Sequence, residues 1–221
     1  IITADESRRY VVPSAPGKKD KNDFKITDKL YECYELAFAG KDINECFGLI
    51  TGRYNEIIKG LGLDFSLDEE YESIKYALLH NAGRDYMASR GEYLNALILA
   101  KYLDYDFINA KHVIFFKDDG SFDSEKTNEK LSEVLKEHPR AVIPGFYGSM
   151  PNGTIKTFSR GGSDITGAIV ARAAGADLYE NWTDVSGFLM ADPRIVDDPK
   201  PIETITYTEL RELSYMGAIV L

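Results

Sequence analysis

The stretch Phe158-Ser159-Arg160-Gly161-Gly162-Ser163-Asp164 is the most informative part of this sequence, because it joins a predicted strand to a predicted helix. Its two glycines let the backbone approach a ligand closely. Ser163 or Asp164 can cap the helix, and the amides at such a helix start favour an anion. The alternative is a capped helix with an exposed arginine, since the stretch lacks the full spacing of a Walker or Rossmann motif.

The segments before this stretch alternate between strand and helix patterns. An apolar run over 112–116, a polar amphipathic helix over 124–138 and a strand over 141–146 follow one another, and this order predicts a β-α-β unit whose first strand is 112–116. The tight turn Pro151-Asn152-Gly153 predicts a hairpin between Gly148 and a strand over 154–158.

The segments after it continue the alternation, with a helix over 161–175, a strand over 178–182 and a final helix over 208–216. This order predicts an α/β fold, a three-layer sandwich with a mainly parallel central sheet and helices on both faces.

The N-terminal part begins with a strand over 10–12 that runs into the small-residue loop 13–17 and the charged run 18–23. A strand that ends in such a loop can expose backbone amides. Apolar residues at helical spacing then predict four helices, over 30–38, 43–58, 67–82 and 86–103.

Two further segments carry polar residues. In Trp182-Thr183-Asp184-Val185-Ser186-Gly187-Phe188, followed by Asp192-Pro193-Arg194, a Thr-Asp pair ends a buried strand. Ligands bind at such strand ends, and the aspartate can accept from a ribose hydroxyl or an adenine amine; an ordinary Asx turn is the alternative. Ser89-Arg90-Gly91-Glu92 is predicted to open a helix, where Glu92 either complements the helix dipole or serves a site.

Composition narrows the class of protein. The chain has 221 residues and a net charge of −10, which argues against nonspecific nucleic-acid binding. No run approaches the roughly 20 apolar residues of a membrane span, so we expect a soluble, cytoplasmic protein. The two cysteines, Cys33 and Cys46, are expected to be reduced core thiols, and the three histidines show no metal-ligand spacing.

Together these segments resemble the aspartokinases, members of the amino-acid kinase superfamily, from the first strand to the last residue. Six segments occur in the family's order: 11–17 (VVPSAPG), 89–92 (SRGE), 144–148 (PGFYG), 160–164 (RGGSD), 182–184 (WTD) and 191–194 (ADPR).

The resemblance implies a role for particular residues. Arg160 would hold the α-carboxylate of aspartate and Glu92 its α-amino group, while Ser14 lines the phosphoryl-transfer loop. The substrate site would also include Gly161 and Ser163. Asp164 would be the catalytic aspartate that orients positive groups around the phosphoryl, and 145–148 resembles a substrate-side loop.

On the nucleotide side, the resemblance assigns Thr183 and Asp184 to the adenosine and Arg194 to the phosphates. Two positions depart from the family's pattern. Leu189 stands where the family often has a nucleotide-stacking tyrosine, and Ile219 where it often has a phosphate-contacting lysine.

The implied activity is aspartate kinase: transfer of the γ-phosphoryl of ATP, with Mg²⁺, to the β-carboxylate of L-aspartate, giving 4-phospho-L-aspartate in the first step of lysine, threonine and methionine biosynthesis. The partners would be these small molecules, with a homo-oligomer for the full-length protein. We expect one catalytic domain over 1–221, incomplete at its N-terminus, where the family has a strand and a Lys-Phe-Gly-Gly loop, and without the family's C-terminal regulatory domains.

Two alternatives stay open. One is another amino-acid kinase that acts on glutamate or N-acetylglutamate, although a Glu92 and Arg160 pair argues against an N-acylated substrate, because an acetylated nitrogen needs no anionic partner. The other is a non-catalytic nucleotide-binding module with a kinase fold.

Overall fold

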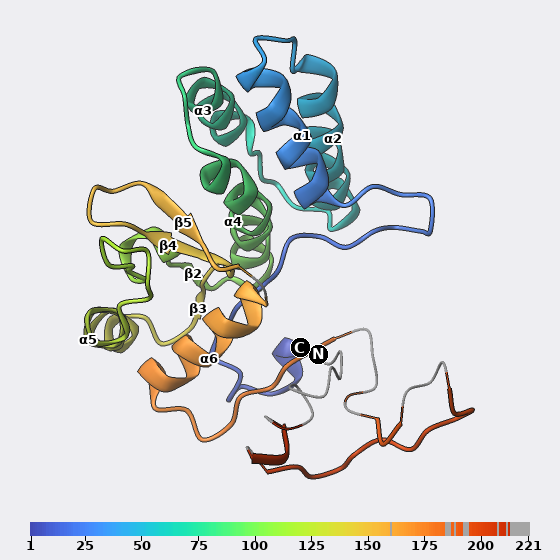
Figure 1. Cartoon of the computed structure of the whole chain (residues 1–221), viewed down its shortest axis with the longest axis vertical. Coiled ribbons are helices and arrows are strands. Elements are labelled where there is room, and N and C mark those ends of the chain that lie inside the picture. Colours follow the sequence, from blue (N-terminus) through green and yellow to red (C-terminus); the bar gives the residue numbers. More distant parts are fainter. Residues whose placement is uncertain are drawn as a thin grey trace. The chain divides into compact units, whose positions relative to one another are not determined.

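The computed structural model describes residues 1–159, 161–183, 187, 189–191, 195–206, 208–210 and 212. The chain divides into a larger unit, Ile1–Tyr179, and a smaller unit, Glu180–Leu221. The larger unit begins with the 3-10 helix η1 (Ile2–Ala4) and has an α/β fold (Figure 1).

A parallel sheet lies at the centre of the larger unit. Its strands are β1 (Tyr10–Val11), β2 (Asp106–Phe107) and β3 (Ala141–Val142), in the order β1-β3-β2. In the register of the sheet, Tyr10 and Asp106 both pair with Ala141. The N–H of Ile143 donates to the carbonyl of Val11 at 2.9 Å, so the pairing of β1 with the β3 segment extends beyond the strand itself. The predicted parallel sheet is confirmed.

Helices cover both faces of this sheet, because the side chains of β3 alternate. Ala141 and Ile143 pack into a core with residues of two helices, whereas Val142 packs against Ala96 and Ala100 of a third. The two helices on the first face are α5 (Ser124–Glu137) and α6 (Gly162–Ala174), and the third is α4 (Arg84–Leu103). The predicted three layers are therefore present.

A second core lies among helices alone. The helices α1 (Ile26–Phe38), α2 (Asn44–Gly60) and α3 (Asp68–Leu79) pack beside α4 around buried Leu30, Tyr54 and Leu67 (Figure 1). Cys33 and Cys46 are buried here as free thiols, as predicted. Burial raises the pKa of both thiols, which keeps them protonated at neutral pH.

The predicted hairpin is confirmed. Its strands β4 (Tyr147–Ser149) and β5 (Ile155–Thr157) pair antiparallel, with Tyr147 opposite Thr157. In the turn, Asn152 Oδ1 accepts from the N–H of Thr154 at 3.0 Å, and Gly153 has a φ of +81°. A side-chain acceptor and a glycine with positive φ are what a tight turn requires.

Two strand predictions were wrong. In 112–116 the chain leaves the 3-10 helix η2 (Ala110–His112) and makes only isolated bridges, while the sheet strand is the earlier β2, too short and polar to produce a pattern. Residues 178–182 form no strand, and Leu178 and Trp182 are largely exposed. An apolar pattern cannot supply the hydrogen-bonding neighbour that a strand needs.

The described part of the smaller unit holds a bridge between Leu189 and Pro201 and a helical turn that starts at Thr208. At the start of this turn, Glu209 Oε2 accepts from the N–H of Thr206, and Thr206 Oγ1 accepts from the N–H of Glu209, which is a capping box. The rest of the predicted helix 208–216 lies outside the described residues. No helix in the described ranges is long and apolar enough to cross a membrane.

We predict that Gly148→Ala destabilises the protein by about 1–3 kcal/mol, because overpacking of a tight core costs this much. A Cβ at Gly148 would lie 2.5 Å from the carbonyl oxygen of Ile114. The control is Gly48→Ala at an exposed position of α2, where a Cβ would meet nothing within 4 Å and should stabilise the helix by up to about 1 kcal/mol. Urea denaturation measures both; equal effects would contradict this packing.

Candidate active site

The loops that follow β1 and β3 meet at one edge of the sheet, because both strands run in the same direction. Ser14 and Ala15 follow β1, and Gly145 follows β3. The N–H of Gly145 donates to the carbonyl of Pro13 at 3.3 Å, which holds the two loops together. Ser14 is exposed on this edge.

The start of α6 lies against the β3 loop with no room for further side chains. A Cβ at Gly145 would lie 2.6 Å from Ser163 Oγ, and one at Gly162 would lie 2.5 Å from a ring carbon of Phe146. Thr166 Oγ1 accepts from the N–H of Phe146 at 3.1 Å and donates to the carbonyl of Gly162 at 2.7 Å. The two glycines therefore bring a helix N-terminus to the carboxyl edge of the sheet.

The predicted capping of α6 by Ser163 or Asp164 was wrong. The N-cap is Gly161, with a φ of +54°, and the helix begins at Gly162, so both polar residues lie within the first turn. Glycine takes this left-handed conformation without the steric cost that a side chain would bring. The first amides of any helix lack intrahelical acceptors, and Gly161, Ser163 and the half-buried Asp164 stand at this helix start.

Glu92 does not open a helix, contrary to the prediction. Helix α4 begins at Arg84, so Glu92 lies in its third turn, beyond the reach of the helix N-terminus. Its side chain is buried, at 6% exposure. The dipole explanation for this carboxylate is therefore removed, and a buried acid needs another reason.

The carboxylate of Glu92 has one hydrogen-bonded oxygen and one without a partner. Oε1 accepts from the N–H of Ala15 at 3.3 Å, whereas Oε2 is buried and has no hydrogen-bond partner in the described structure. Burial raises the pKa of Glu92 to about 7, while the backbone hydrogen bonds, that of Ala15 among them, and Arg90 lower it less strongly. Such an oxygen suits a positively charged donor from a ligand.

Three neighbours fix the place where Ala15 meets Glu92. A Cβ at Gly91 would lie 2.9 Å from Ala15 Cβ, so glycine allows the loop to approach α4. Tyr54 Oη donates to the carbonyl of Gly91 at 2.7 Å, and Asn95 Nδ2 donates to the carbonyl of Ser14 at 2.7 Å. Sequence reasoning missed Tyr54 and Asn95, because neither carries a local signal.

Arg90 is also buried, but it faces aromatic rings. Its guanidinium lies 4.4 Å, 4.3 Å and 5.4 Å from the ring centroids of Tyr86, Tyr93 and Tyr147, and it donates to Ser89 Oγ. Cation–π contacts of this kind stabilise a desolvated arginine. Within the SRGE segment, Arg90 therefore joins α4 to the hairpin, and Glu92 carries the unpartnered group.

The other predicted positions are distributed as follows. Arg160, Asp184, Arg194 and Ile219 lie outside the described residues. Thr183 is exposed and Leu189 half-buried in the smaller unit, which is described by itself. Among the described residues, no group of three or more His, Cys, Asp or Glu side chains could hold a metal ion.

Comparison with known proteins identifies the family. A model of the amino acid kinase family matches residues 5–221. Aspartokinase 3 of Bacillus subtilis is 36% identical over 231 residues, covering 98% of this chain and 51% of the relative. The crystal structure of Clostridium acetobutylicum aspartate kinase superposes with a TM-score of 0.92 at 55% identity, over 97% of this chain and 49% of that one.

Escherichia coli aspartokinase III, solved in complex with aspartate and ADP, gives a TM-score of 0.70 at 26% identity, covering 98% of this chain and 52% of its own. The chain belongs to the amino acid kinase family, and it spans about half the length of the aspartokinases that it matches.

We predict that Glu92→Gln stabilises the protein more at pH 8 than at pH 5. The folded-state pKa of about 7 lies above the unfolded value near 4.5, so wild-type stability is full below pH 4.5 and falls as the pH rises to 7. Glutamine cannot ionise and should not show this loss. The difference between the two pH values should be about 2 kcal/mol by urea denaturation; a pH-independent effect of the substitution would contradict a buried, protonated Glu92.

Proposed function

We propose that the protein is an aspartate kinase, which transfers the γ-phosphoryl group of ATP to the β-carboxylate of L-aspartate. The observation that carries this proposal is the buried, unpartnered Oε2 of Glu92 at the sheet edge where the β1 and β3 loops meet. A free α-ammonium group would supply the missing donor and the missing charge. The related enzyme solved with aspartate and ADP supports the same choice of substrates.

The proposed chemistry needs no general base. An aspartate carboxylate, with an ordinary pKa of about 3.9, is already ionised at neutral pH. The task is to align two anionic reactants and cancel the charge between them, which donors and cations perform. In this proposal the first amides of α6, around Gly161 and Ser163, face the anions, while Asp164 orients the positive groups.

The remaining site assignments follow the family resemblance. Arg160 binds the α-carboxylate of aspartate, because a guanidinium can grip a carboxylate with two parallel bonds. Ser14, exposed on the β1 loop, borders the phosphoryl group. Thr183, Asp184, Leu189 and Arg194 bind the nucleotide, with Leu189 providing an apolar contact where relatives often stack a ring.

Magnesium fits this site as part of the ATP complex. Mg²⁺ usually keeps several waters and is held by substrate phosphates with one or two carboxylates, rather than by an all-protein cage. The described residues offer no such cage, but Asp164 stands at the start of α6. The ion would neutralise charge on the phosphates, and Asp164 would lie on the protein side of it.

The direct test of the proposal measures ADP release with aspartate, glutamate and N-acetylglutamate as acceptors, beside ATP binding by calorimetry. Of the three acceptors, we expect only aspartate to give ADP release. Turnover with N-acetylglutamate would point to another amino-acid kinase, and ATP binding without acceptor-dependent turnover would indicate a binding module.

We predict that the KM for aspartate falls about tenfold between pH 6 and pH 8, while the KM for ATP changes little. With a pKa of about 7, roughly a tenth of Glu92 is ionised at pH 6 and most of it at pH 8. Only the ionised form attracts an ammonium group. In Glu92→Gln the aspartate KM should be high and should lose this pH dependence; an unchanged profile would remove Glu92 from the substrate site.

We predict that Arg160→Lys raises the aspartate KM by about tenfold or more, because an ammonium cannot reproduce a bidentate grip on a carboxylate. The matched control is Arg172→Lys, at an exposed position in the last turn of α6, which should change the KM less than twofold. Steady-state kinetics with varied aspartate measures both. Equal KM values for the two variants would exclude Arg160 from the carboxylate subsite.

A further inference from the structure

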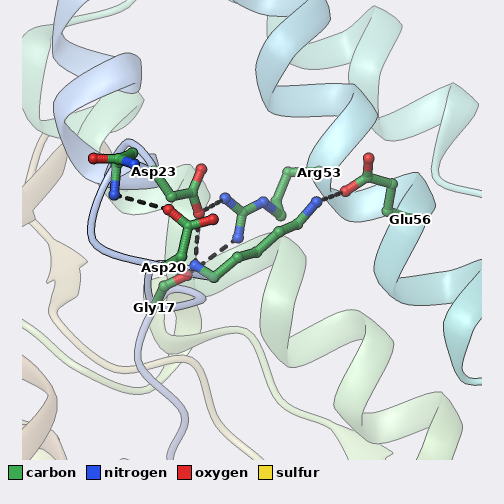
Figure 2. Close-up of polar contacts among 7 residues, drawn as sticks. Gly17, Asp20, Asp23, Arg53 and Glu56 are labelled. Atoms are coloured by element: carbon green, nitrogen blue, oxygen red, sulfur yellow. Dashed lines mark hydrogen bonds and ion pairs between the residues drawn. The ribbon is translucent and has the colours of Figure 1, made fainter.

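An arginine outside the proposed site is buried at the far end of the β1 loop. Arg53 lies on α2, its side chain 5% exposed, with the guanidinium 5.3 Å from the ring centroid of Phe24. It forms an ion pair with Asp23 and donates to the carbonyl of Gly17 at 3.2 Å (Figure 2). A residue of α2 therefore binds the loop at two points, the Asp23 side chain and the Gly17 backbone carbonyl.

The loop conformation places the Asp23 carboxylate to bind Arg53. Asp23 Oδ2 also accepts from the N–H of Lys19 at 2.6 Å, which closes the chain into a turn around the carboxylate. These two donors hold the pKa of Asp23 below its usual value, so the carboxylate stays ionised. By contrast, both side chains of the neighbouring ion pair between Lys19 and Glu56 are exposed, so this pair contributes little to stability.

The same loop is fastened to α4 only two residues away. The N–H of Ala15 donates to Glu92 Oε1 and the carbonyl of Ser14 accepts from Asn95, while Arg53 holds the carbonyl of Gly17. Only Pro16 separates Ala15 from Gly17, and its ring fixes φ. The connection between the two anchored groups is therefore short and has one backbone torsion fixed, which limits how far the Gly17 carbonyl can move without shifting the Ala15 amide.

We propose that Arg53 and Asp23 are positioning residues, which act through Gly17 and Pro16 to hold the Ala15 amide against Glu92. They thereby set the geometry of the subsite for the substrate's ammonium group. This inference rests on the proposed function. Neither side chain touches the substrate in this arrangement. A merely structural role, in which the pair joins the loop to α2, would lower stability without a selective effect on the ammonium subsite.

The test compares Arg53→Lys and Asp23→Asn with the control Glu56→Gln, which breaks the exposed pair with Lys19 and leaves the bonds of Arg53 to Asp23 and Gly17 in place. We expect both positioning variants to raise the aspartate KM about tenfold, as for loss of one charge-assisted hydrogen bond. The KM for ATP should stay within twofold of wild type, and the control should match wild type in both constants. Aspartate KM values within twofold of wild type in folded Arg53→Lys and Asp23→Asn would overturn the proposal.

A second measurement keeps the test separate from the proposed function. Carbon-13 NMR titration of the Glu92 carboxyl group in the ligand-free protein should show a higher pKa in Arg53→Lys and Asp23→Asn than in wild type and Glu56→Gln, because the Ala15 hydrogen bond that lowers it is lost. If wild type shows no aspartate-dependent turnover, the proposed function fails and this titration alone decides. An unchanged Glu92 pKa in both variants would then overturn the positioning role.

Discussion

The hydrogen bond from the Ala15 amide to the Glu92 carboxylate joins the loop after β1 to helix α4. Ala15 belongs to the loop that leaves the sheet at β1, and Glu92 belongs to the helix shared by the helical core and the sheet. One end of the bond is backbone, which depends on the loop conformation, and the other is a buried acid, which costs free energy to ionise. The surrounding contacts hold the Ala15 amide and the Glu92 carboxylate in place beside each other.

Close packing of backbone segments at glycine residues provides most of these contacts. Glycines at 91, 145 and 162 each stand where a Cβ would lie within 3 Å of another segment. These contacts bring the β1 loop to α4 and the start of α6 to the β3 loop. Phe146 adopts a φ of +81°, which is uncommon for a residue with a side chain, and its N–H is held by Thr166. Strain of this kind persists only when neighbours determine the backbone, and it occurs often beside functional sites.

Helices with strong periodicity could be predicted from the sequence, and so could the hairpin, because Asn152 and Gly153 carry their turn chemistry locally. Strands of two residues could not be predicted, because β2 is too short for an alternating pattern to show. The segment 178–182 was wrongly predicted as a strand, because it has an apolar pattern but, among the described residues, no neighbouring strand to pair with. The glutamate was found through its motif, but its position was misjudged, since the start of α4 at Arg84 has no side-chain cap to mark it.

The sequence by itself determined the alternation of strands and helices, the candidate residues Glu92 and Arg160–Asp164, and the resemblance that links them, because these depend on neighbours along the chain. Only the tertiary structure decided that Glu92 is buried with one unpartnered oxygen, that Tyr54 and Asn95 support it, and that Arg53 grips the loop beside it. Those properties arise between residues that are 36 to 81 positions apart. Burial and hydrogen bonding at such separations exist only once the chain has folded, because no local pattern records which distant group will exclude water or supply a donor.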